Sequence, residues 1–317
     1  MGEKPVTATK FRLVTRSDFD GLVCGVLLKE ASLIDEIFFV HPKDMQDGKI
    51  AISARDITTN LPYVPGCHLA FDHHSSEIER GGGQKPANHI IDPGALSAAR
   101  VVYRYFGGLS SFPRIGQDLM EAVDKADSAG FATDEILRAE GWALLNFLMD
   151  SRTGLGRFRQ FRISNYELMM KLIDYCRDHS VEQILALPDV AERVELYRQH
   201  EAQFCDQLMR CSRIYRDLVV LDLRNETTIF AGNRFMVYAM YPQCRVSVHV
   251  LWGVKQQNTV FAIGKSIIDR SSPIDVGAIC LSYGGGGHEA AGTCQVDNDK
   301  ADAALAELVG KLASPAQ

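Results

Sequence analysis

The side chains best suited to chemistry in this sequence form the tripeptide Asp72-His73-His74, a carboxylate followed by two imidazoles. It comes directly after an apolar run, 67–71, and before a segment rich in serine and glycine. The run predicts a buried strand, and open α/β sheets place their ligand sites where such strands end. Taken alone, the tripeptide fits a turn cap beside two surface histidines equally well, so the rest of the chain must decide.

Other carboxylates follow two further predicted strands. Asp18 and Asp20 lie in the turn after the predicted strand 11–15, and Asp56 follows the predicted strand 49–54. Counting the strand before the tripeptide, three strands each deliver a carboxylate at their C-terminal ends. Solubility alone does not require such a coincidence, which favours a shared site.

These residue types are typical of a divalent metal site. Asp18 and Asp20, two residues apart, can each face a different ion, and Asp56, His73 and Asp127 complete an oxygen-rich set with one imidazole. Such a set suits Mn²⁺, and Mg²⁺ less well, and differs from the thiolates of structural zinc. Two ions about 3.5–4 Å apart would activate a water for in-line hydrolysis at phosphorus. Calcium is excluded because the later acidic positions of a calcium loop are missing.

The order of the predicted elements indicates an α/β protein with two domains. Strands alternate with helices in the first part, as in a parallel sheet with crossover helices. We expect a parallel-sheet domain at 1–187, a helical linker at 188–216 within a long helix 190–215, and a smaller α/β domain at 217–317. The other predicted helices are 22–31, 96–105, 118–126, 136–149, 165–179, 181–187, 275–283 and 299–312, and the other predicted strands are 36–40, 218–223, 228–231, 245–252, 260–266 and 293–296.

Composition narrows the class of protein. With 317 residues, 46% of them hydrophobic, the chain can bury a core in each of two domains. A net charge of −6 argues against a dedicated binder of duplex DNA. Eight scattered cysteines without a Cys-x-x-Cys pair indicate reduced thiols of a cytoplasmic protein. The polar first ten residues and the lack of an apolar run of roughly 18 residues predict neither a signal nor a membrane span.

Two later segments could contact an anion. The run Gly284 to Gly287 exposes backbone N–H groups beside His288, and Arg270 lies upstream. The segment 152–162 carries four arginines interleaved with two phenylalanines. That segment could hold a phosphate chain and stack a base, but the alternation also describes an amphipathic structural segment, which we favour. The charge run at 192–201 in the long helix predicts a solvated face.

Taken in order, these motifs resemble the DHH phosphoesterase superfamily, in its two-domain DHH plus DHHA1 branch. That branch includes nanoRNases, RecJ-type exonucleases, cyclic-dinucleotide phosphodiesterases and exopolyphosphatase-related proteins. The resemblance covers nearly the whole chain. It is carried by residues 14–21, Asp56, Asp72 to His74, Asp127-Ser128, Arg270, and Gly284 to His288 with Ala291-Gly292.

The resemblance implies a role for each residue. Asp18 would bind the first metal, Asp20, His73 and Asp127 the second, and Asp56 would bridge the two. Asp72 would orient an imidazole, and His74 would face the scissile phosphate. The implied substrate-binding residues, which would hold the far end of the substrate, are Arg270, Gly285, Gly286, Gly287 and His288.

The implied activity is that of a manganese-dependent phosphoesterase that cleaves short single-stranded oligonucleotides or dinucleotides. The resemblance also allows a homodimer. Two alternatives stay open: a phosphoanhydride hydrolase acting on polyphosphate or pyrophosphate, and a nucleotide-binding regulatory protein with a decayed site. The retained carboxylates argue against decay, since each would be costly to bury without its metal.

One position departs from the family pattern. Arg16 stands where the first motif usually has a metal-binding histidine, and an arginine stays protonated and cannot ligate a cation. Either the first metal site is weakened, or another group such as His41 fills it, or Arg16 contacts the substrate phosphate with fewer ions bound. We expect activity to survive.

Overall fold

The computed structural model describes residues 10–74, 77–78 and 86–313, and within them the chain forms two compact units. The first comprises residues up to 130 with 140–151 and 158–194, and the second comprises the remainder. The predicted α/β class is confirmed. Two segments of the predicted first domain, 131–139 and 152–157, cluster with the second unit. The long helix α10 (Pro188–Cys211) contributes to both units, since the division falls between residues 194 and 195.

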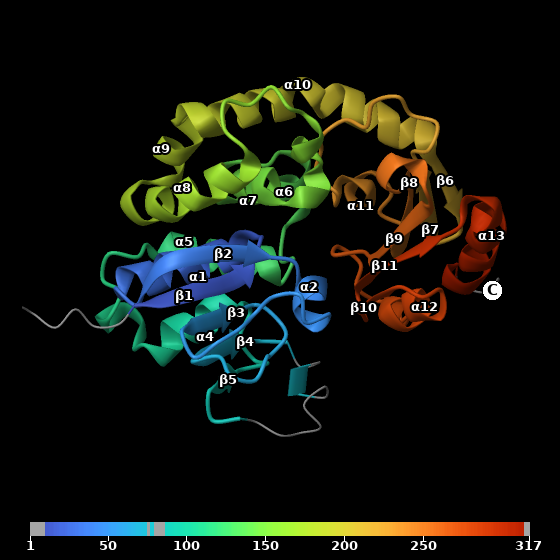
Figure 1. The fold of residues 1–317 in the computed structure, drawn as a ribbon. Helices are drawn as coiled ribbons and strands as arrows, with labels where there is room; N and C mark the ends of the chain where they lie inside the picture. The colour runs from blue at the N-terminus through green and yellow to red at the C-terminus, as the bar shows by residue number, and fades with distance from the viewer. Residues whose placement is uncertain (1–9, 75–76, 79–85, 314–317) are drawn as a thin grey trace, which may run out of the picture. The chain divides into compact units, whose positions relative to one another are not determined.

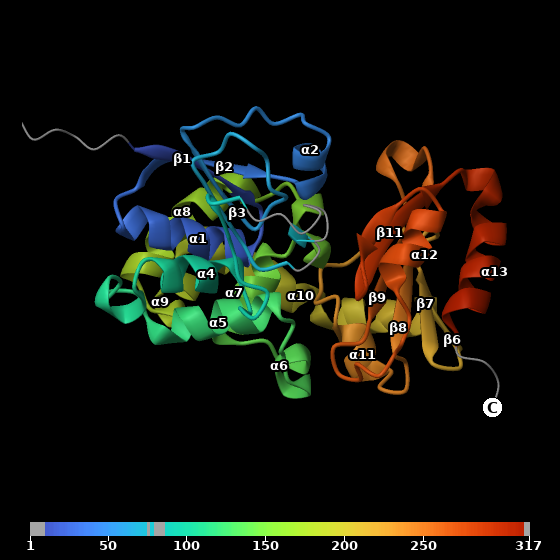
Figure 2. The same cartoon turned by 90° about the horizontal axis from the view of Figure 1, so that it is seen from below.

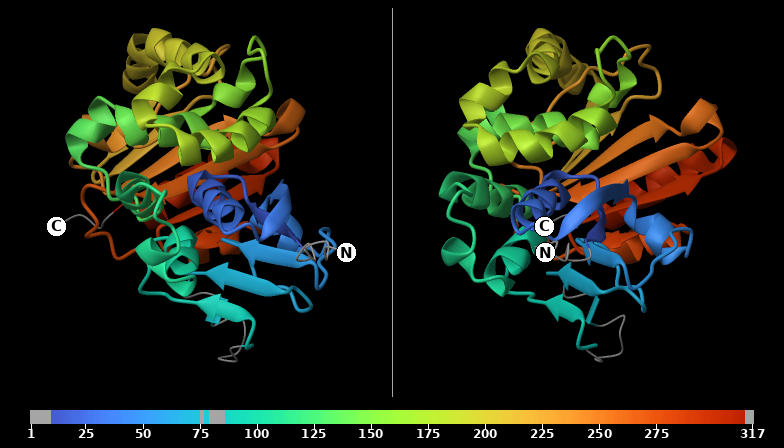
Figure 3. Two further views of the ribbon diagram at one scale, coloured as in Figure 1. Left: turned by 90° about the vertical axis from the view of Figure 1, so that its left-hand side faces the viewer. Right: turned by 60° about the vertical axis from the view of Figure 1, so that its left-hand side comes forward.

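The first unit is built on a parallel sheet with strand order β2-β1-β3-β4-β5. The strands point the same way, as Figure 3 shows for the blue to teal arrows. Their carboxyl ends therefore share one edge, where the Asp-His-His tripeptide begins at the last residue of β4. The strands are β1 Phe11–Arg16, β2 Ile34–Val40, β3 Asp56–Thr59, β4 Leu69–Asp72 and β5 His89–Ile91.

Helices and loops cover this sheet (Figure 1). Helix α1 packs against β1 and against α4, α5 and α8, which explains why it is buried at ten of its twelve positions. Val14 and Val40 instead pack with Met45 of α2 and with Leu61. The helices of this unit are α1 Phe19–Glu30, α2 Pro42–Gln46, α4 Ala98–Tyr105, α5 Gln117–Asp127, α7 Gly141–Met149, α8 Asn165–Asp178, α9 Val181–Ala186 and the start of α10 Pro188–Cys211.

The predicted strand 49–54 is wrong, because that segment is irregular and β3 begins at Asp56. Ile50 and Ile52 occupy alternate positions, as in a strand, but they pack into the cluster around Val14 without joining the sheet. The residues that pair with β1 are the four of β3, which come later in the chain. This shift moves Asp56 from the carboxyl end of a strand to its amino end.

The second unit contains a mixed six-stranded sheet with strand order β10-β11-β9-β8-β7-β6, in which β7 and β8 are parallel and the other neighbours antiparallel. Leu218 and Val220 belong to the core shared with α12 and α13, whereas Leu221 packs with α10 and α11. Figure 2 shows α12 and α13 beside the sheet. The elements are α6 Thr133–Leu137, β6 Ser212–Tyr215, β7 Leu218–Asp222, α11 Met236–Met240, β8 Val246–Trp252, β9 Thr259–Lys265, α12 Val276–Ser282, β10 Gly286–His288, β11 Ala291–Val296 and α13 Ala301–Leu312.

Three predicted elements differ in the structure, two of them because of tertiary contacts. The predicted strand 228–231 is irregular because side chains of α10 take its backbone bonds: Gln207 bonds the Thr228 oxygen and the Phe230 nitrogen. The predicted helix 190–215 ends at Cys211, and the residues after it pair with β7 as an edge strand. The predicted helix 136–149 is two helices, α6 and α7, separated near Gly141, whose φ of 52° favours glycine.

Among the described residues, no helix is both long and apolar enough to cross a bilayer. All eight cysteines are unpaired thiols.

Candidate metal centre

The first two carboxylates are positioned by the start of α1. Asp18 is the N-cap of this helix, and its Oδ1 accepts a hydrogen bond from Gly21 N at 2.9 Å. A side chain at Gly21 would place a Cβ only 2.0 Å from the Arg16 carbonyl oxygen, so the turn must be tight and the residue must be glycine. The Asp-Phe-Asp-Gly motif therefore holds both aspartates at the carboxyl end of β1.

Asp20 points inward and is only 2% exposed. Its two oxygens accept hydrogen bonds from Ala98 N at 3.0 Å and Ala99 N at 2.8 Å, in the first turn of α4. Burial, together with the negative charges of Asp127 and Asp18, raises the pKa of Asp20 well above its ordinary value. A buried carboxylate beside two others is a natural partner for a cation.

His73 and Asp127 complete the same cluster. Nε2 of His73 lies 2.8 Å from Oδ2 of Asp127, the last residue of α5, but without the alignment of a hydrogen bond. Nδ1 of His73 faces the Ala95 carbonyl oxygen at 3.2 Å. Burial alone would lower the pKa of His73, but the close Asp127 carboxylate, and the charges of Asp20 and Asp72, outweigh it and raise the pKa to about 9.

This cluster fits a divalent ion. One ligand atom each from Asp20, His73 and Asp127 lies within 4.8 Å of the others. The Ala95 carbonyl can hold the Nδ1 proton, which leaves Nε2, a buried atom with no hydrogen bond, to face the cation. Two carboxylates and one imidazole are ligands of the kind that Mn²⁺ accepts.

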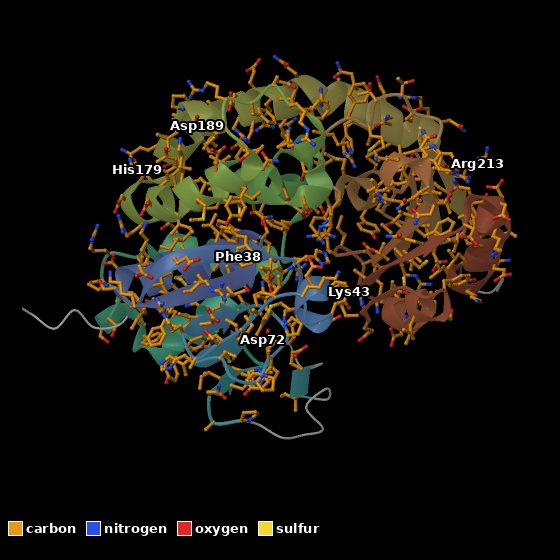
Figure 4. The ribbon with its side chains drawn as sticks, in the orientation of Figure 1. Phe38, Lys43, Asp72, His179, Asp189 and Arg213 are labelled. Carbon is orange, nitrogen blue, oxygen red and sulfur yellow. The ribbon has the colours of Figure 1, made fainter. Side chains whose placement is uncertain are left out.

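Asp72 and His74 form a second group beside this cluster. Asp72, labelled in Figure 4, ends β4 and is 1% exposed. Its Oδ1 lies 2.7 Å from Nδ1 of His74 and accepts a hydrogen bond from the backbone N–H of His73, while Oδ2 is buried without a partner. The His74 ring contacts the His73 ring edge-on and is 40% exposed. Asp72 thus contacts an imidazole that remains accessible, and the roles of both residues toward a substrate stay predictions.

Asp56 is not part of the centre, which corrects its prediction as a bridging ligand. It lies at the amino end of β3, where Arg12 Nε contacts its Oδ1 at 2.7 Å and Ser53 donates to its Oδ2 through both N–H and O–H. Burial would raise the pKa of Asp56, but Arg12 and Ser53 hold it below its usual value. Both oxygens are satisfied, and the residue is a structural partner of Arg12.

Asn60 is a site residue that the sequence analysis missed. It follows β3 at the carboxyl edge, is 2% exposed and has a φ of 54°, a left-handed conformation that asparagine tolerates. Its Nδ2 lies 3.2 Å from Oδ1 of Asp18. The signal was present in the sequence as a polar residue directly after the β-branched run Ile57 to Thr59, once the strand is placed there.

Arg16 also lies on Asp18. Its Nε is 2.8 Å from Oδ2 of Asp18, so the guanidinium sits at the carboxyl end of β1 next to the cluster. His41, the proposed replacement ligand, caps α2 and accepts from Lys43 N at 3.1 Å. Neither His41 nor Asp18 belongs to the groups of closely spaced metal-ligand atoms found among the described residues.

Of the predicted substrate-binding residues of the second unit, the glycine-rich stretch lies at one edge of its sheet. Gly286 to His288 form β10, which pairs with β11, and Arg270 is exposed in a loop. A Cβ at Gly285 would meet the Thr293 carbonyl oxygen at 2.2 Å, whereas a Cβ at Gly286 would meet nothing within 4 Å. Packing therefore explains the first of these glycines and leaves the second without a structural reason. Their roles toward a substrate stay predictions.

Within the arginine-rich segment, the favoured structural interpretation fits the residues that pack in the first unit. The guanidinium carbon of Arg193 lies 4.2 Å from the centre of the Phe161 ring, and Arg162 pairs with Asp189 at 3.0 Å. Arg193 is 1% exposed and bonds the carbonyls of Asp189 and Ile163. The prediction of a solvated face is therefore wrong at Arg193, because an arginine can be buried when its N–H groups find carbonyl partners.

The first unit holds a carboxylate–imidazole centre at the carboxyl edge of a parallel sheet, and the second unit has a mixed sheet. This combination defines the class of two-domain phosphoesterases that the motifs indicate. The pGpG-specific phosphodiesterase PggH from Vibrio cholerae matches with a TM-score of 0.82 and 59% identity, over 96% of this chain and 99% of that chain. The chain belongs to the DHH phosphoesterase superfamily, in the DHH plus DHHA1 branch.

More distant structures are also similar. CDC45 from Entamoeba histolytica matches with a TM-score of 0.50 and 8% identity over 96% of both chains, a likeness of fold alone. RecJ from Thermus thermophilus in complex with Mn²⁺ matches with a TM-score of 0.48 and 14% identity, over 96% of this chain and 52% of that chain, too loosely to bear on this chain's metal. Family models and curated proteins give no match.

Proposed function

We propose that this protein is a divalent-metal-dependent phosphodiesterase that hydrolyses short linear oligonucleotides, with the dinucleotide pGpG as its substrate. The observation that carries the reaction is the cluster of Asp20, His73 and Asp127, whose unsatisfied Nε2 and buried carboxylate are suited to a cation. The choice of pGpG is supported by the 59% identity, over nearly the full length, to a pGpG-specific enzyme.

The ion would be held by Asp20, His73 and Asp127. When bound, it would lower the pKa of a water and offset charge on a phosphoryl oxygen. The Ala95 carbonyl keeps the His73 proton on Nδ1, away from the ion. Mn²⁺ is the proposed metal, with Mg²⁺ as a weaker substitute, because an imidazole is a better ligand for the former.

His74 would donate to an oxygen of the scissile phosphate. Asp72 accepts from its Nδ1, so the opposite nitrogen, Nε2, points away from that anchor on a half-exposed ring. When it carries a proton on both nitrogens, the ring can bind a phosphate oxygen and give a proton to the leaving oxygen. Asp72 acts through His74 as a positioning residue.

The second unit would bind the rest of the substrate. Gly286 leaves room for a phosphate at exposed backbone N–H groups, and His288 and Arg270 add donors. Gly285, Gly287 and His288 lie in the same turn and edge strand, which keeps these groups together.

The test is a hydrolysis panel with Mn²⁺, with Mg²⁺ and with a chelator. The substrates are pGpG, pApA, a cyclic dinucleotide, a five-nucleotide RNA and polyphosphate. Metal-dependent release of mononucleotide from pGpG, lost in Asp127→Asn, is the expected result. Cleavage of polyphosphate alone would instead identify a phosphoanhydride hydrolase, and metal binding without any cleavage would identify a regulatory protein.

The matched control is Asp56→Asn, which makes the same chemical change at the opposite edge of the same sheet. It should lose stability and retain activity per folded molecule. Loss of activity in both variants would show that the assay reports folding and not the centre.

A further inference from the structure

The place of a second metal ion beside Asp18 is already taken by groups of the protein. Oδ1 of Asp18 accepts from Gly21 N at 2.9 Å and from Asn60 Nδ2 at 3.2 Å. Oδ2 contacts Arg16 Nε at 2.8 Å and Asn60 Nδ2 at 3.3 Å. Asp18 therefore has a donor on each oxygen, in contrast to the unsatisfied Nε2 of His73.

The two groups on Asp18 are the wrong kind for a metal site. The Arg16 guanidinium stays positively charged at every pH at which proteins fold, so it repels a divalent ion and cannot ligate one. Asn60 turns its amide N–H toward Asp18 and leaves its Oδ1 buried without a hydrogen bond, and neither group carries the negative charge that a bridging carboxylate would supply. The expected bridge, Asp56, is held by Arg12 at the other end of β3.

Asn60 is fixed in this arrangement by the backbone. Its N–H donates to the Phe71 carbonyl oxygen at 3.0 Å, and its left-handed φ of 54° turns the side chain at the end of β3. It is buried to 2% exposure, so the amide has little freedom to turn away from Asp18. The contact thus belongs to the folded sheet edge and is more than a chance surface rotamer.

We infer that the centre holds one divalent ion, on Asp20, His73 and Asp127, and that Arg16 serves as a built-in second cation that contacts the substrate phosphate. Arg16 is anchored by Asp18 and its side chain is 37% exposed, so its remaining N–H groups can reach an anion. The role of Arg16 toward a phosphate rests on the proposed function. The number of ions does not.

The first experiment counts ions on the intact protein, by calorimetric titration with MnCl₂ and by electron paramagnetic resonance at rising Mn²⁺. We expect one site and the signal of isolated Mn²⁺ ions. Two sites per chain, or the signal of an exchange-coupled pair, would overturn the inference. This count needs no substrate, so it can fail or succeed whether or not pGpG is cleaved.

The second experiment restores the missing ligands with the double variant Arg16→His, Asn60→Asp. We expect the number of bound Mn²⁺ to rise from one to two, with a coupled-pair signal. A folded double variant that still binds one ion would show that these residues do not exclude the second. Arg12→His, which repeats the arginine-to-histidine change at the amino end of β1, is the control and should bind one ion.

The third experiment tests the contact of Arg16 with phosphate, using inorganic phosphate as the probe. In Arg16→Ala the Mn²⁺ count should stay at one, while phosphate should bind the Mn²⁺-loaded protein about tenfold more weakly, the effect of losing one charged hydrogen bond. Unchanged phosphate binding would remove Arg16 from the role of second cation. Arg16→Lys, which keeps the charge, should recover part of the loss.

Discussion

The two edges of the parallel sheet each hold an arginine next to an aspartate, but only the carboxyl edge adds a second, buried aspartate without a cation of its own. At the amino edge, Asp56 has both oxygens bonded, by Arg12 and by Ser53, and its pKa lies below the usual value. At the carboxyl edge, Asp20 is buried among like charges and its pKa lies well above the usual value. The comparison teaches that a carboxylate paired with a cation of the protein is structural, whereas a buried one crowded by like charges calls for a cation.

The largest expected effect tests the carboxyl edge. Asp127→Asn removes the negative charge of one of the three ligands and leaves a weaker, neutral amide oxygen, so Mn²⁺ affinity and pGpG hydrolysis should each fall by more than about a hundredfold. Loss of a residue that only supports a ligand costs about ten- to a hundredfold. Steady-state kinetics at saturating Mn²⁺ and calorimetry check both values. Activity within a few-fold of wild type would show that this edge is no more functional than the other.

Asp72→Asn should have the next largest effect, about ten- to a hundredfold in kcat, because the variant weakens the hold on His74 without removing a ligand. The number of Mn²⁺ ions should not change. A change in the pH profile of kcat, with KM little altered, would separate a positioning role from a structural one.

In the metal-free protein, the free energy of unfolding should depend on pH because of the charged groups at the carboxyl edge. The pKa of His73 is raised from 6.5 to about 9 in the folded protein, so the protonated imidazole stabilises the fold. This stabilisation is fully present below pH 6.5 and is lost as pH rises through 9. The loss should reach about 3 kcal/mol at most. Urea unfolding in a chelator at several pH values measures it.

Two controls sharpen this pH prediction. His73→Gln should flatten the alkaline limb, whereas Asp56→Asn should leave that limb intact and change only the acid side, since the lowered pKa of Asp56 contributes stability that is lost at low pH. A metal-free wild type with flat stability from pH 6.5 to 9 would contradict the assignment of a charged His73.

At the amino edge, Asp56→Asn should cost stability and nothing else. Loss of the ion pair with Arg12, which is partly exposed, should lower the free energy of unfolding by about 1–2 kcal/mol. The Mn²⁺ count and kcat of the folded variant should match wild type. Loss of the bound Mn²⁺ in this variant would show that Asp56 is a ligand of the metal centre after all.

The smallest effects are expected at two neighbouring glycines of the second unit. There too, one residue is required by packing and the other is not. Gly286→Ala has open space for its Cβ, so the fold should keep its stability, while KM for pGpG rises a few-fold if a phosphate approaches there. Gly285→Ala meets backbone atoms and should destabilise the protein instead. Equal thermal unfolding of both variants would show that packing does not distinguish these positions.

The sequence predicted the residues that local motifs position. Asp18 and Asp20 follow from a strand, a tight turn and a helix, and Asp72 with His73 from a short apolar strand. It mistook Asp56 for a site residue because a four-residue strand gives little local signal for where it begins. The pairing of β3 with β1 sets that register, and with it places Asn60 at the site.

Two further errors have the same physical origin. The segment 228–231 has the composition of a strand, but side chains of α10 satisfy its backbone, and the residues 212–215 continue a helical pattern but pair with β7. Such choices depend on partners distant in sequence, which a local pattern does not contain. Long, strongly patterned elements such as α1, β8 and α13 were therefore predicted within a few residues.

The hydrogen bonds of Asp20 link the metal centre to the backbone of a neighbouring helix. Its two oxygens hold the amide hydrogens of Ala98 and Ala99, which open α4. A cation that draws the carboxylate toward itself changes how firmly those two hydrogens are kept from solvent. The rates at which these two amide hydrogens exchange with deuterium should therefore report whether the metal site is occupied, in the absence of any substrate.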